Sequence, residues 1–521
     1  MDFLLAILPV LVLFALIVFM RKSVIYSATA ALATLLVIAA WWGVPALSMT
    51  AAGIRGVLVA IEIILIVASA VFIIEIIRRQ KLFEPIERLF RKVASDYRAQ
   101  TLLVGLGLVF FVEGAAGFGT PAIIAVPLLI ALGFKPLHAV AVALIGDTIP
   151  VSFGAVGLPI TYGVDSTIEV LTAQHAEVTA STIVGVAAMN VLMSMVLAMI
   201  LVAVIVKLRS RPWSEWVEFL PFAAVSGLAV SLPALGIALF VGPELPSIVG
   251  GFVGMILIGL MARKGWLIPK TAKTEEVTQT VRLKDIKRAI YPYALLVGLL
   301  ILTRVGYFGV GEWLQQSVVG NDDIFGTGIG FTVEPFYSVA TILILTAAAT
   351  LVLSWQHIND KKSVFKDVLT RVQRPFVALA VVLVFVQIFI NSGSAFMGAS
   401  MPVVIAESIS GVSGGMWPFI APAMGAMGSF ISGSATVSNL VFSGLQYDIA
   451  LSLDMNPVYL LTLQTVGASA GNMVALHNVV AALAIAGISE ASAQKVIRTN
   501  LWPLVALLSA VGLMGLFISS L

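Results

Sequence analysis

Runs of about 20 apolar, uncharged residues recur along this 521-residue chain, and the first extends from Phe3 to Met20. A run of that length can span the hydrocarbon core of a bilayer as one α-helix. Hydrophobic residues make up 60% of the chain. Charged residues make up only 11%, against about 25% in a soluble domain. We therefore expect an all-α polytopic membrane protein whose partner is the lipid bilayer, and we expect no nucleic-acid binding.

The chain has no cysteine, which excludes thiol catalysis, disulfides and cysteine-ligated metals. No metal-ligand spacing, nucleophile elbow, phosphate loop or dinucleotide fingerprint is convincing. We expect no catalytic residue, no metal and no cofactor, and hence no enzyme. The first apolar run is interpreted as a transmembrane helix and not as a signal peptide, because its basic pair, Arg21 and Lys22, follows the apolar core.

The basic residues mark one side of the membrane. All but Arg55, Lys135 and Arg304 of the 30 Lys and Arg residues fall in six stretches: 21–22, 78–98, 207–211, 263–288, 361–374 and 495–498. The positive-inside rule places these stretches in the cytoplasm. The loops 161–177 and 305–334 contain acids and no Lys or Arg, which suits the outer face. We expect about 12 crossings of the plasma (inner) membrane, with the N- and C-termini outside.

Two regions do not follow the pattern of clean helices. In the first, from Glu113 to Ile160, glycine or proline interrupts the apolar sequence every few residues, and acids stand at Glu113 and Asp147. The second covers residues 416–486 and is interrupted at Ser432–Asn439 and again at Gly467–Asn472. Broken backbone at membrane depth persists only where it is buried in protein or lines a cavity. An ionisable residue at such a place is a candidate for function.

The two regions share an order of features. Each has a polar hairpin tip, then a helix led by proline (Pro136 or Pro457), then a break ten residues later at Gly146 or Gly467. The charges flanking the two proline-led helices predict that these helices run in opposite directions. Two inverted repeats, each with a re-entrant hairpin and a broken helix, are typical of secondary transporters, with the binding site between the repeats.

This order also predicts a domain division. We expect scaffold helices in 1–100, with an amphipathic segment at 78–98 along the membrane surface. The first transport core is expected in 101–206 and central scaffold helices in 207–374. The second transport core follows in 375–499, and a last transmembrane helix covers 500–521.

The motifs EGAAGFGTP (Glu113–Pro121) and PVSFGAVGLP (Pro150–Pro159) resemble those of the bacterial L-lactate permease family. VGPELPSI (Val241–Ile248), NSG (Asn391–Gly393) and SGSATVSN (Ser432–Asn439) support the resemblance, which covers nearly the whole chain. It implies a carrier that takes up lactate, and often glycolate, with protons.

The chain departs from the family pattern at four places. The family usually has Asn at Asp147, Asp at Ala435, Lys near Asn472, and Pro-Gln in place of His477-Asn478. A family acid and a family base are therefore missing together, which avoids an uncompensated buried charge. We hypothesise that the charge pair has moved to Asp147 and His477.

No Lys or Arg lies between Pro136 and Val206 or between Pro375 and Gln494, so these helices cannot supply a cationic clamp for a carboxylate. The remaining donors are hydroxyls, amides and free backbone N–H groups at the starts of half-helices. The candidate substrate-binding residues are Gly117, Gly119, Thr120, Ser152, Ser434, Thr436, Ser438, Asn439 and Asn472. The alternative for each is that a small residue only lets two helices pack closely.

Three residues are candidates for proton coupling. Asp147, in the middle of an apolar run, is the first choice, although it could instead end a helix by bonding nearby backbone. Glu113 could carry a proton or cap the amides of Gly114–Gly117. His477 titrates near neutral pH, but a lone histidine on an apolar face is often structural.

The sequence thus predicts a secondary active transporter that takes up L-lactate or a related short 2-hydroxy monocarboxylate, such as glycolate, with H⁺. A Na⁺-coupled symporter of small organic anions is the nearest alternative, since carbonyls and hydroxyls at the breaks could equally hold Na⁺. An intramembrane enzyme and a channel are further alternatives, and a homodimer is left open.

Overall fold

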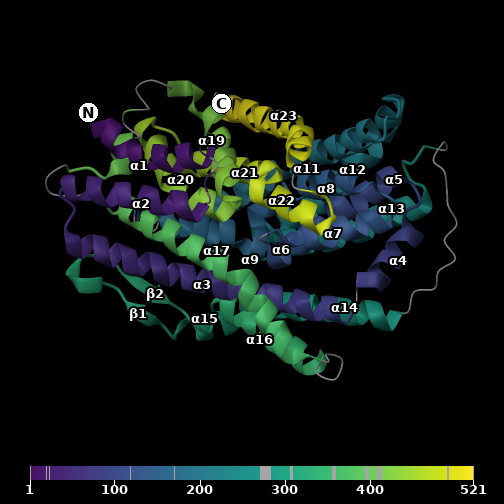
Figure 1. Ribbon diagram of the computed structural model, residues 1–521, viewed down its shortest axis with the longest axis horizontal. Coiled ribbons are helices and arrows are strands. Elements are labelled where there is room, and N and C mark those ends of the chain that lie inside the picture. The colour runs from purple at the N-terminus through teal and green to yellow at the C-terminus, as the bar shows by residue number, and fades with distance from the viewer. Residues whose placement is uncertain are drawn as a thin grey trace.

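The computed structural model is built almost entirely of helices, which lie side by side along its longest axis (Figure 1). The structure describes the whole chain except residues 1, 19, 21, 23, 82, 118, 169–170, 270–282, 305–308, 355–359, 394–397, 406–407, 409–413, 490–491 and 520–521. Among the described residues, seven helices are long and apolar enough to cross a membrane, or eight if one bent pair counts as a span. Five shorter apolar helices accompany them. The predicted all-α polytopic class is confirmed.

The N-terminal segment forms four helices: α1 (Asp2–Val18), α2 (Val24–Trp41), α3 (Ala46–Arg79) and α4 (Phe83–Val93). The strongly amphipathic α4 ends at Val93, so it is shorter than the 78–98 segment expected from the basic residues. Arg98 lies instead inside the bundle, where it is only 3% exposed. Its guanidinium is 2.7 Å from Asp96 and sits over the ring of Phe219, and these contacts offset the cost of burying the charge.

The first repeat begins with one continuous helix through α5 (Tyr97–Leu102), the π-helical turn Leu103–Leu108 and α6 (Val109–Ala116). A hairpin tip leads to α7 (Thr120–Ala131), and α8 (Pro136–Gly146) then bends by 54° into Pro150–Ile168. That second piece comprises the 3-10 turn Pro150–Phe153, α9 (Gly154–Ile160), the π-helical turn Thr161–Asp165 and α10 (Ser166–Ile168). The repeat closes with α11 (His175–Leu208).

The second repeat has the same order. Its hairpin is α19 (Trp417–Ser432) and α20 (Ala435–Ser452), preceded by the 3-10 turn Gly414–Met416. The proline-led helix α21 (Pro457–Gly471) breaks at the 3-10 turn Asn472–Val474 and continues as α22 (Leu476–Ile485). The last helix, α23 (Ala493–Ser519), starts seven residues before the expected position 500. The predicted hairpin and broken helix are therefore present in both repeats.

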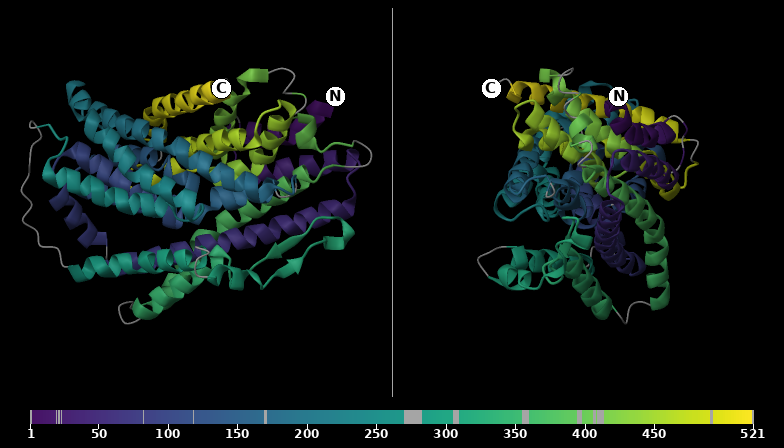
Figure 2. Two further views of the ribbon diagram at one scale, coloured as in Figure 1. Left: turned by 180° about the vertical axis from the view of Figure 1, so that it is seen from behind. Right: turned by 90° about the vertical axis from the view of Figure 1, so that its left-hand side faces the viewer.

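The segments between the repeats form α12 (Ser214–Phe240), α13 (Pro246–Lys264), α14 (Leu283–Arg304), α15 (Val310–Gln315), α16 (Val339–Ser354) and α17 (Lys361–Ile390). Strands β1 (Val319–Asn321) and β2 (Phe331–Val333) pair antiparallel around the 3-10 turn Ile324–Gly326, with Gly320 opposite Thr332. Figure 2 shows the teal segment of α14, α15, β1 and β2 along one side of the molecule, away from the yellow-green helices of the second repeat. The apolar core is one large cluster that reaches from α1 to α23.

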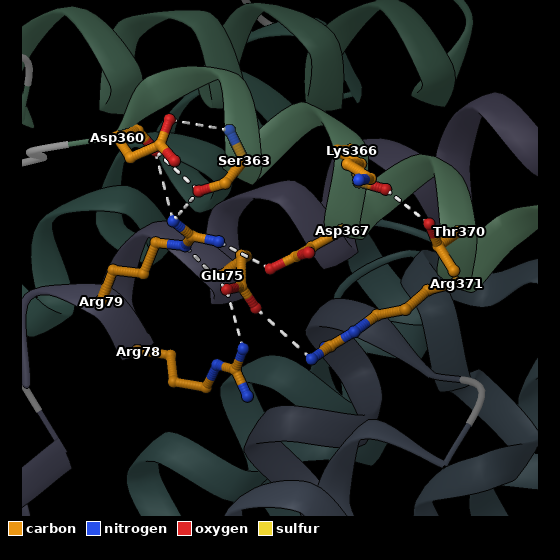
Figure 3. Close-up of polar contacts among 9 residues, drawn as sticks. All are labelled: Glu75, Arg78, Arg79, Asp360, Ser363, Lys366, Asp367, Thr370 and Arg371. Atoms are coloured by element: carbon orange, nitrogen blue, oxygen red, sulfur yellow. Dashed lines mark hydrogen bonds and ion pairs between the residues drawn. The ribbon is translucent and has the colours of Figure 1, made fainter.

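Helices α3 and α17 are joined at their basic ends by a charge network (Figure 3). Glu75, only 1% exposed, accepts from Arg78 at 2.8 Å and from Arg79 at 2.9 Å, and lies 3.5 Å from Arg371 of α17. Arg79 also reaches Asp367 at 2.6 Å. Asp360 caps α17. Its carboxyl accepts a hydrogen bond from the backbone N–H of Ser363, and this bond lowers the pKa of the carboxyl. The network fixes α3 against α17.

Candidate functional site

The two hairpin tips are built on glycines that leave the right-handed helical conformation. Gly117 ends α6 with φ +60°, and Gly119 precedes α7 with φ +73°. In the second repeat, Gly433 ends α19 with φ +67°, and the side chain of Ser434 caps α20 by accepting from the N–H of Val437. Each tip therefore presents the N-terminal end of a helix, where free N–H groups and the helix dipole favour an anion.

The break of the first repeat contains an unusual backbone conformation. Ala155, Val156 and Gly157 follow one another in the left-handed region, with φ of 45°, 59° and 84°. A β-branched residue such as Val156 rarely adopts this conformation, and strain of this kind concentrates at functional sites. Residue 117 has to be small, because a Cβ built on Gly117 would lie 2.6 Å from the Cβ of Ala155. The first hairpin tip and the break of the following helix thus form one tightly packed unit.

The tips and breaks of both repeats enclose a small cavity. It is lined by Glu113, Gly117, Gly119, Val151, Gly154, Ala155, Pro159, Gly433, Ser434, Ala435, Thr436 and Asn472. The centre of a water molecule can occupy about 20 Å³ of it, which is room for about one water. The helices α7 and α20 both begin at its wall. The described part of the lining therefore combines two helix N-termini with hydroxyl and amide groups and a single acid, and it contains no Lys or Arg.

The carboxyl groups of Glu113 and Asp147 lie close enough to act on one another. Both side chains are buried, with exposed fractions of 4% each. Glu113 Oε2 and Asp147 Oδ1 have no hydrogen-bond partner among the described residues. In the described part of the chain no cation pairs with either group, and two such neighbouring buried carboxyl groups are well suited to share one proton.

Hydrogen bonds cross from one repeat to the other at the breaks. Asn472 Nδ2 donates to Asp147 Oδ2 at 3.3 Å, and Asn478 Nδ2 donates to Asn472 Oδ1 at 2.7 Å. The hydroxyls of Ser152 and Ser469 are 2.8 Å apart. Hydrogen bonds therefore link Asp147 through Asn472 to Asn478, and Glu113 at the cavity neighbours Asp147.

The predicted substrate-binding residues fall into two groups. Gly117, Gly119, Ser434, Thr436 and Asn472 line the cavity, whereas Thr120, Ser152, Ser438 and Asn439 do not. Asn439 donates to the carbonyl of Pro159 at 2.9 Å and to Thr465 at 3.2 Å. Ser438 donates to the carbonyl of Gly425 and accepts from Gln464. These hydrogen bonds hold the second hairpin to its neighbours, and the assignment of Ser438 and Asn439 to substrate binding stays a prediction.

The proton-coupling candidates are placed differently from one another. Glu113 does not cap its own hairpin glycines; its carboxyl lies against Gly154 of the broken helix. Asp147 lies behind the cavity wall, bonded to Asn472. The side chain of His477 is outside the described residues.

The candidate set missed two polar residues at the second break, Ser469 within it and Asn478 just after it. Their polarity in an otherwise apolar stretch was the signal that could have found them.

The helical bundle, the paired hairpins and the polar cavity between the repeats define a polytopic membrane transporter. The sequence model of the L-lactate permease family matches residues 2–521, so the chain belongs to that family. Among curated relatives, an L-lactate permease of Bacillus subtilis is 27% identical over 470 residues, which cover 81% of this chain and 79% of the relative. The glycolate permease GlcA of Escherichia coli is 26% identical over 460 residues, covering 81% and 78%.

Among solved structures, the YdaH transporter of Alcanivorax borkumensis is similar with a TM-score of 0.34 and 17% identity, over 74% of this chain and 86% of that one. With a TM-score this low, the fold assignment rests on the helices of this chain.

Two of the positions that were expected to depart from the family pattern lie on the wall of one cavity. Ala435 and Asn472 come from different elements of the second repeat, and both line the cavity. An acid at 435 and a base near 472 would therefore face the same small space. With Ala at 435 and Asn at 472, Glu113 is the ionisable side chain among the described residues of the lining.

Proposed function

We propose that this protein is a secondary active transporter that takes up L-lactate or a related short 2-hydroxy monocarboxylate, such as glycolate, with protons. One observation carries the proposal: the helix N-termini of α7 and α20 meet at a cavity whose single lining acid, Glu113, has Asp147 beside it. An anion is favoured by the helix ends, and a proton by the carboxyl pair.

Each part of a 2-hydroxy acid has a partner in the lining. The substrate carboxylate accepts from the free N–H groups at the start of α20 and from the hydroxyls of Ser434 and Thr436. The 2-hydroxyl group pairs with the amide of Asn472. Protonated Glu113 donates to the substrate, so substrate and proton cross together with no net charge, which avoids the cost of moving an ion through hydrocarbon.

Transport requires the cavity to open, because it has room for about one water. The expected boundaries at 100/101 and 374/375 fall inside continuous helices. We therefore propose that the first repeat, from Tyr97 to Leu208, and the second, from Trp417 to Ile485, move against a scaffold made of α1–α4, α12–α17 and the last helix. The charge network between α3 and α17 keeps this scaffold rigid. The strained turn at Ala155–Gly157 is the element that changes conformation, because strained backbone is readily released when its packing changes.

The proposal is tested in proteoliposomes. Labelled L-lactate is exchanged against unlabelled lactate, glycolate, acetate and succinate, and uptake is then driven by an imposed pH gradient in sodium-free buffer. We expect lactate and glycolate to compete, succinate to compete at least tenfold less, and accumulation to follow the pH gradient. If neither 2-hydroxy acid competes, the substrate assignment fails. If uptake requires sodium, the coupling ion is Na⁺. Chemical change of the substrate would favour an enzyme, and the absence of counterflow would favour a channel.

We also propose that both termini lie outside the inner membrane. The chain has no cysteine, so single cysteines report their side directly. A membrane-impermeant maleimide should label Ser519→Cys in intact cells and leave Ser210→Cys unlabelled until the cells are opened. If Ser210→Cys alone is labelled in intact cells, the protein has the opposite orientation, with both termini in the cytoplasm. Cross-linking of a single-cysteine variant in the membrane would show whether the protein is a homodimer.

A further inference from the structure

A second cavity, of about 180 Å³, lies between the C-terminal end of α11 and the first turns of α23. It is lined by Val204, Lys207, Leu208, Arg498, Thr499 and Trp502. It shares no lining residue with the cavity between the repeats. Two cations, a hydroxyl and an indole thus face one space whose remaining walls are aliphatic.

The two cations of this cavity have no acidic partner among the described residues. Lys207 and Arg498 are both exposed. Their basic neighbours are engaged: Arg211 is 2.6 Å from Glu215, and Arg209 sits over the rings of Tyr97 and Phe134. Lys495, one turn before Arg498 on α23, adds a further positive charge.

Most helices around the cavity carry no acid near it, and among the described residues the acids of α12, which packs against α11, form no ion pair with Lys207 or Arg498. Glu215 of α12 is bound by Arg211 at 2.6 Å and by the hydroxyl of Tyr97 at 2.7 Å. Glu218 is exposed. The helices α8, α19, α21, α22 and α23 contain no Asp or Glu, and α11 carries its only acid, Glu177, in its first turn, at the opposite end from Lys207. The cavity therefore attracts an anion, and an Arg–Lys pair suits the oxygens of a phosphate group.

The position of α23 indicates where such a phosphate comes from. Only 33% of the apolar 18-residue stretch of this helix is buried, which is the smallest share among the seven long spans. Leu501, Trp502 and Val505 are exposed on its outer surface next to the cavity. Trp at the edge of an apolar surface, beside clustered basic residues, is typical of the cytoplasmic membrane interface.

We propose that this cavity binds the headgroup phosphate of an anionic phospholipid of the inner leaflet. Lys207 and Arg498 hold the phosphate oxygens, and the acyl chains lie along the apolar surface of α23. A bound headgroup joins α11 of the first repeat to the helix that follows the second. The inference does not depend on which substrate the protein carries.

The test is lipid retention measured by native mass spectrometry on the purified full-length protein. We expect wild-type protein to retain phosphatidylglycerol in preference to phosphatidylcholine. The double variant Lys207→Gln/Arg498→Gln should retain phosphatidylglycerol about tenfold less, because each basic residue contributes to binding an anionic headgroup. The charge-preserving variant Lys207→Arg/Arg498→Lys should stay within twofold of wild type. The control Lys362→Gln/Lys366→Gln removes two exposed cations of α17 and should not change retention.

Equal phosphatidylglycerol retention by wild type and by a folded Lys207→Gln/Arg498→Gln protein overturns the proposal. If millimolar inorganic phosphate displaces the lipid from wild type but not from this double variant, the cavity is a site for a soluble anion and the lipid assignment fails. Folding of each variant is checked by its thermal unfolding midpoint in the same detergent.

Discussion

Asp147→Asn is expected to abolish proton-driven accumulation while leaving exchange intact. With one proton per substrate, wild-type protein should accumulate lactate about tenfold per unit of pH gradient, since one pH unit corresponds to about 1.4 kcal/mol. The variant should only equilibrate the substrate across the membrane. The substitution keeps the shape of the side chain and an oxygen that can accept from Asn472, so it removes the ionisable group with little structural change. Counterflow should therefore persist at no less than about a third of the wild-type rate, since that exchange requires no net proton movement.

The physical reason lies in the pairing of the two acids. Glu113 faces the cavity and Asp147 lies behind it, so the pair can pass a proton away from the substrate. A single carboxyl group without a second acid beside it has no such acceptor. Glu113→Gln should also lose coupling, and in addition it should weaken substrate binding, because it changes a group in the wall of the cavity.

The matched control for Asp147→Asn is Asp322→Asn, which neutralises an exposed acid of the segment around β1 and β2. It should accumulate lactate as wild type does. The readouts are lactate accumulation under an imposed pH gradient and lactate-driven alkalinisation of the medium. If alkalinisation persists in Asp147→Asn, then Asp147 is not the coupling acid.

The architecture of this chain could be predicted because local signals define it. Pro136 and Pro457 each start a helix at the first position, where a missing N–H costs nothing, and each helix breaks at a cluster of small residues. Glycines with positive φ at 117 and 433 mark the hairpin tips. These signals act over a few residues, and so they are readable without knowledge of the tertiary structure.

The site was less predictable because its contacts join distant parts of the chain. Asp147 and Asn472 are 325 positions apart, and Ser152 and Ser469 are 317 apart. Val156 adopts a left-handed conformation that its side chain disfavours, so only the surrounding packing can impose it. Arg98 was expected at the membrane surface; it is buried because Asp96, two residues earlier, neutralises it.

Gly154→Ala is expected to reduce transport by about 10- to 100-fold while leaving the protein folded. The backbone at Gly154 has φ −68° and ψ 159°, a conformation that alanine adopts without strain. The added methyl group, however, would collide with Glu113 Oε1 and lie 3.1 Å from Glu113 Cδ. The obstacle is the end of a flexible side chain, so the chain relieves the clash by moving the carboxyl group and not the backbone.

That displacement takes Glu113 away from the substrate and from Asp147. Loss of one hydrogen bond to a charged group costs about 1.5–3 kcal/mol, which corresponds to roughly 10- to 150-fold in affinity. The loss should therefore appear mainly as weaker lactate binding in counterflow, with the thermal unfolding midpoint nearly unchanged.

Gly236→Ala is the matched control for Gly154→Ala. Gly236 lies within α12, and a Cβ built there has no neighbouring atom within 4 Å. It should transport as wild type does and unfold at the same or a slightly higher temperature, because alanine stabilises a helix relative to glycine. Normal transport by Gly154→Ala would mean that the carboxyl group of Glu113 tolerates displacement, and Glu113 would then not contact the substrate. Equal losses of transport and stability would instead show that Gly154 is needed for packing alone. A selective loss of transport would assign the contact between Glu113 and the broken helix to the transport site.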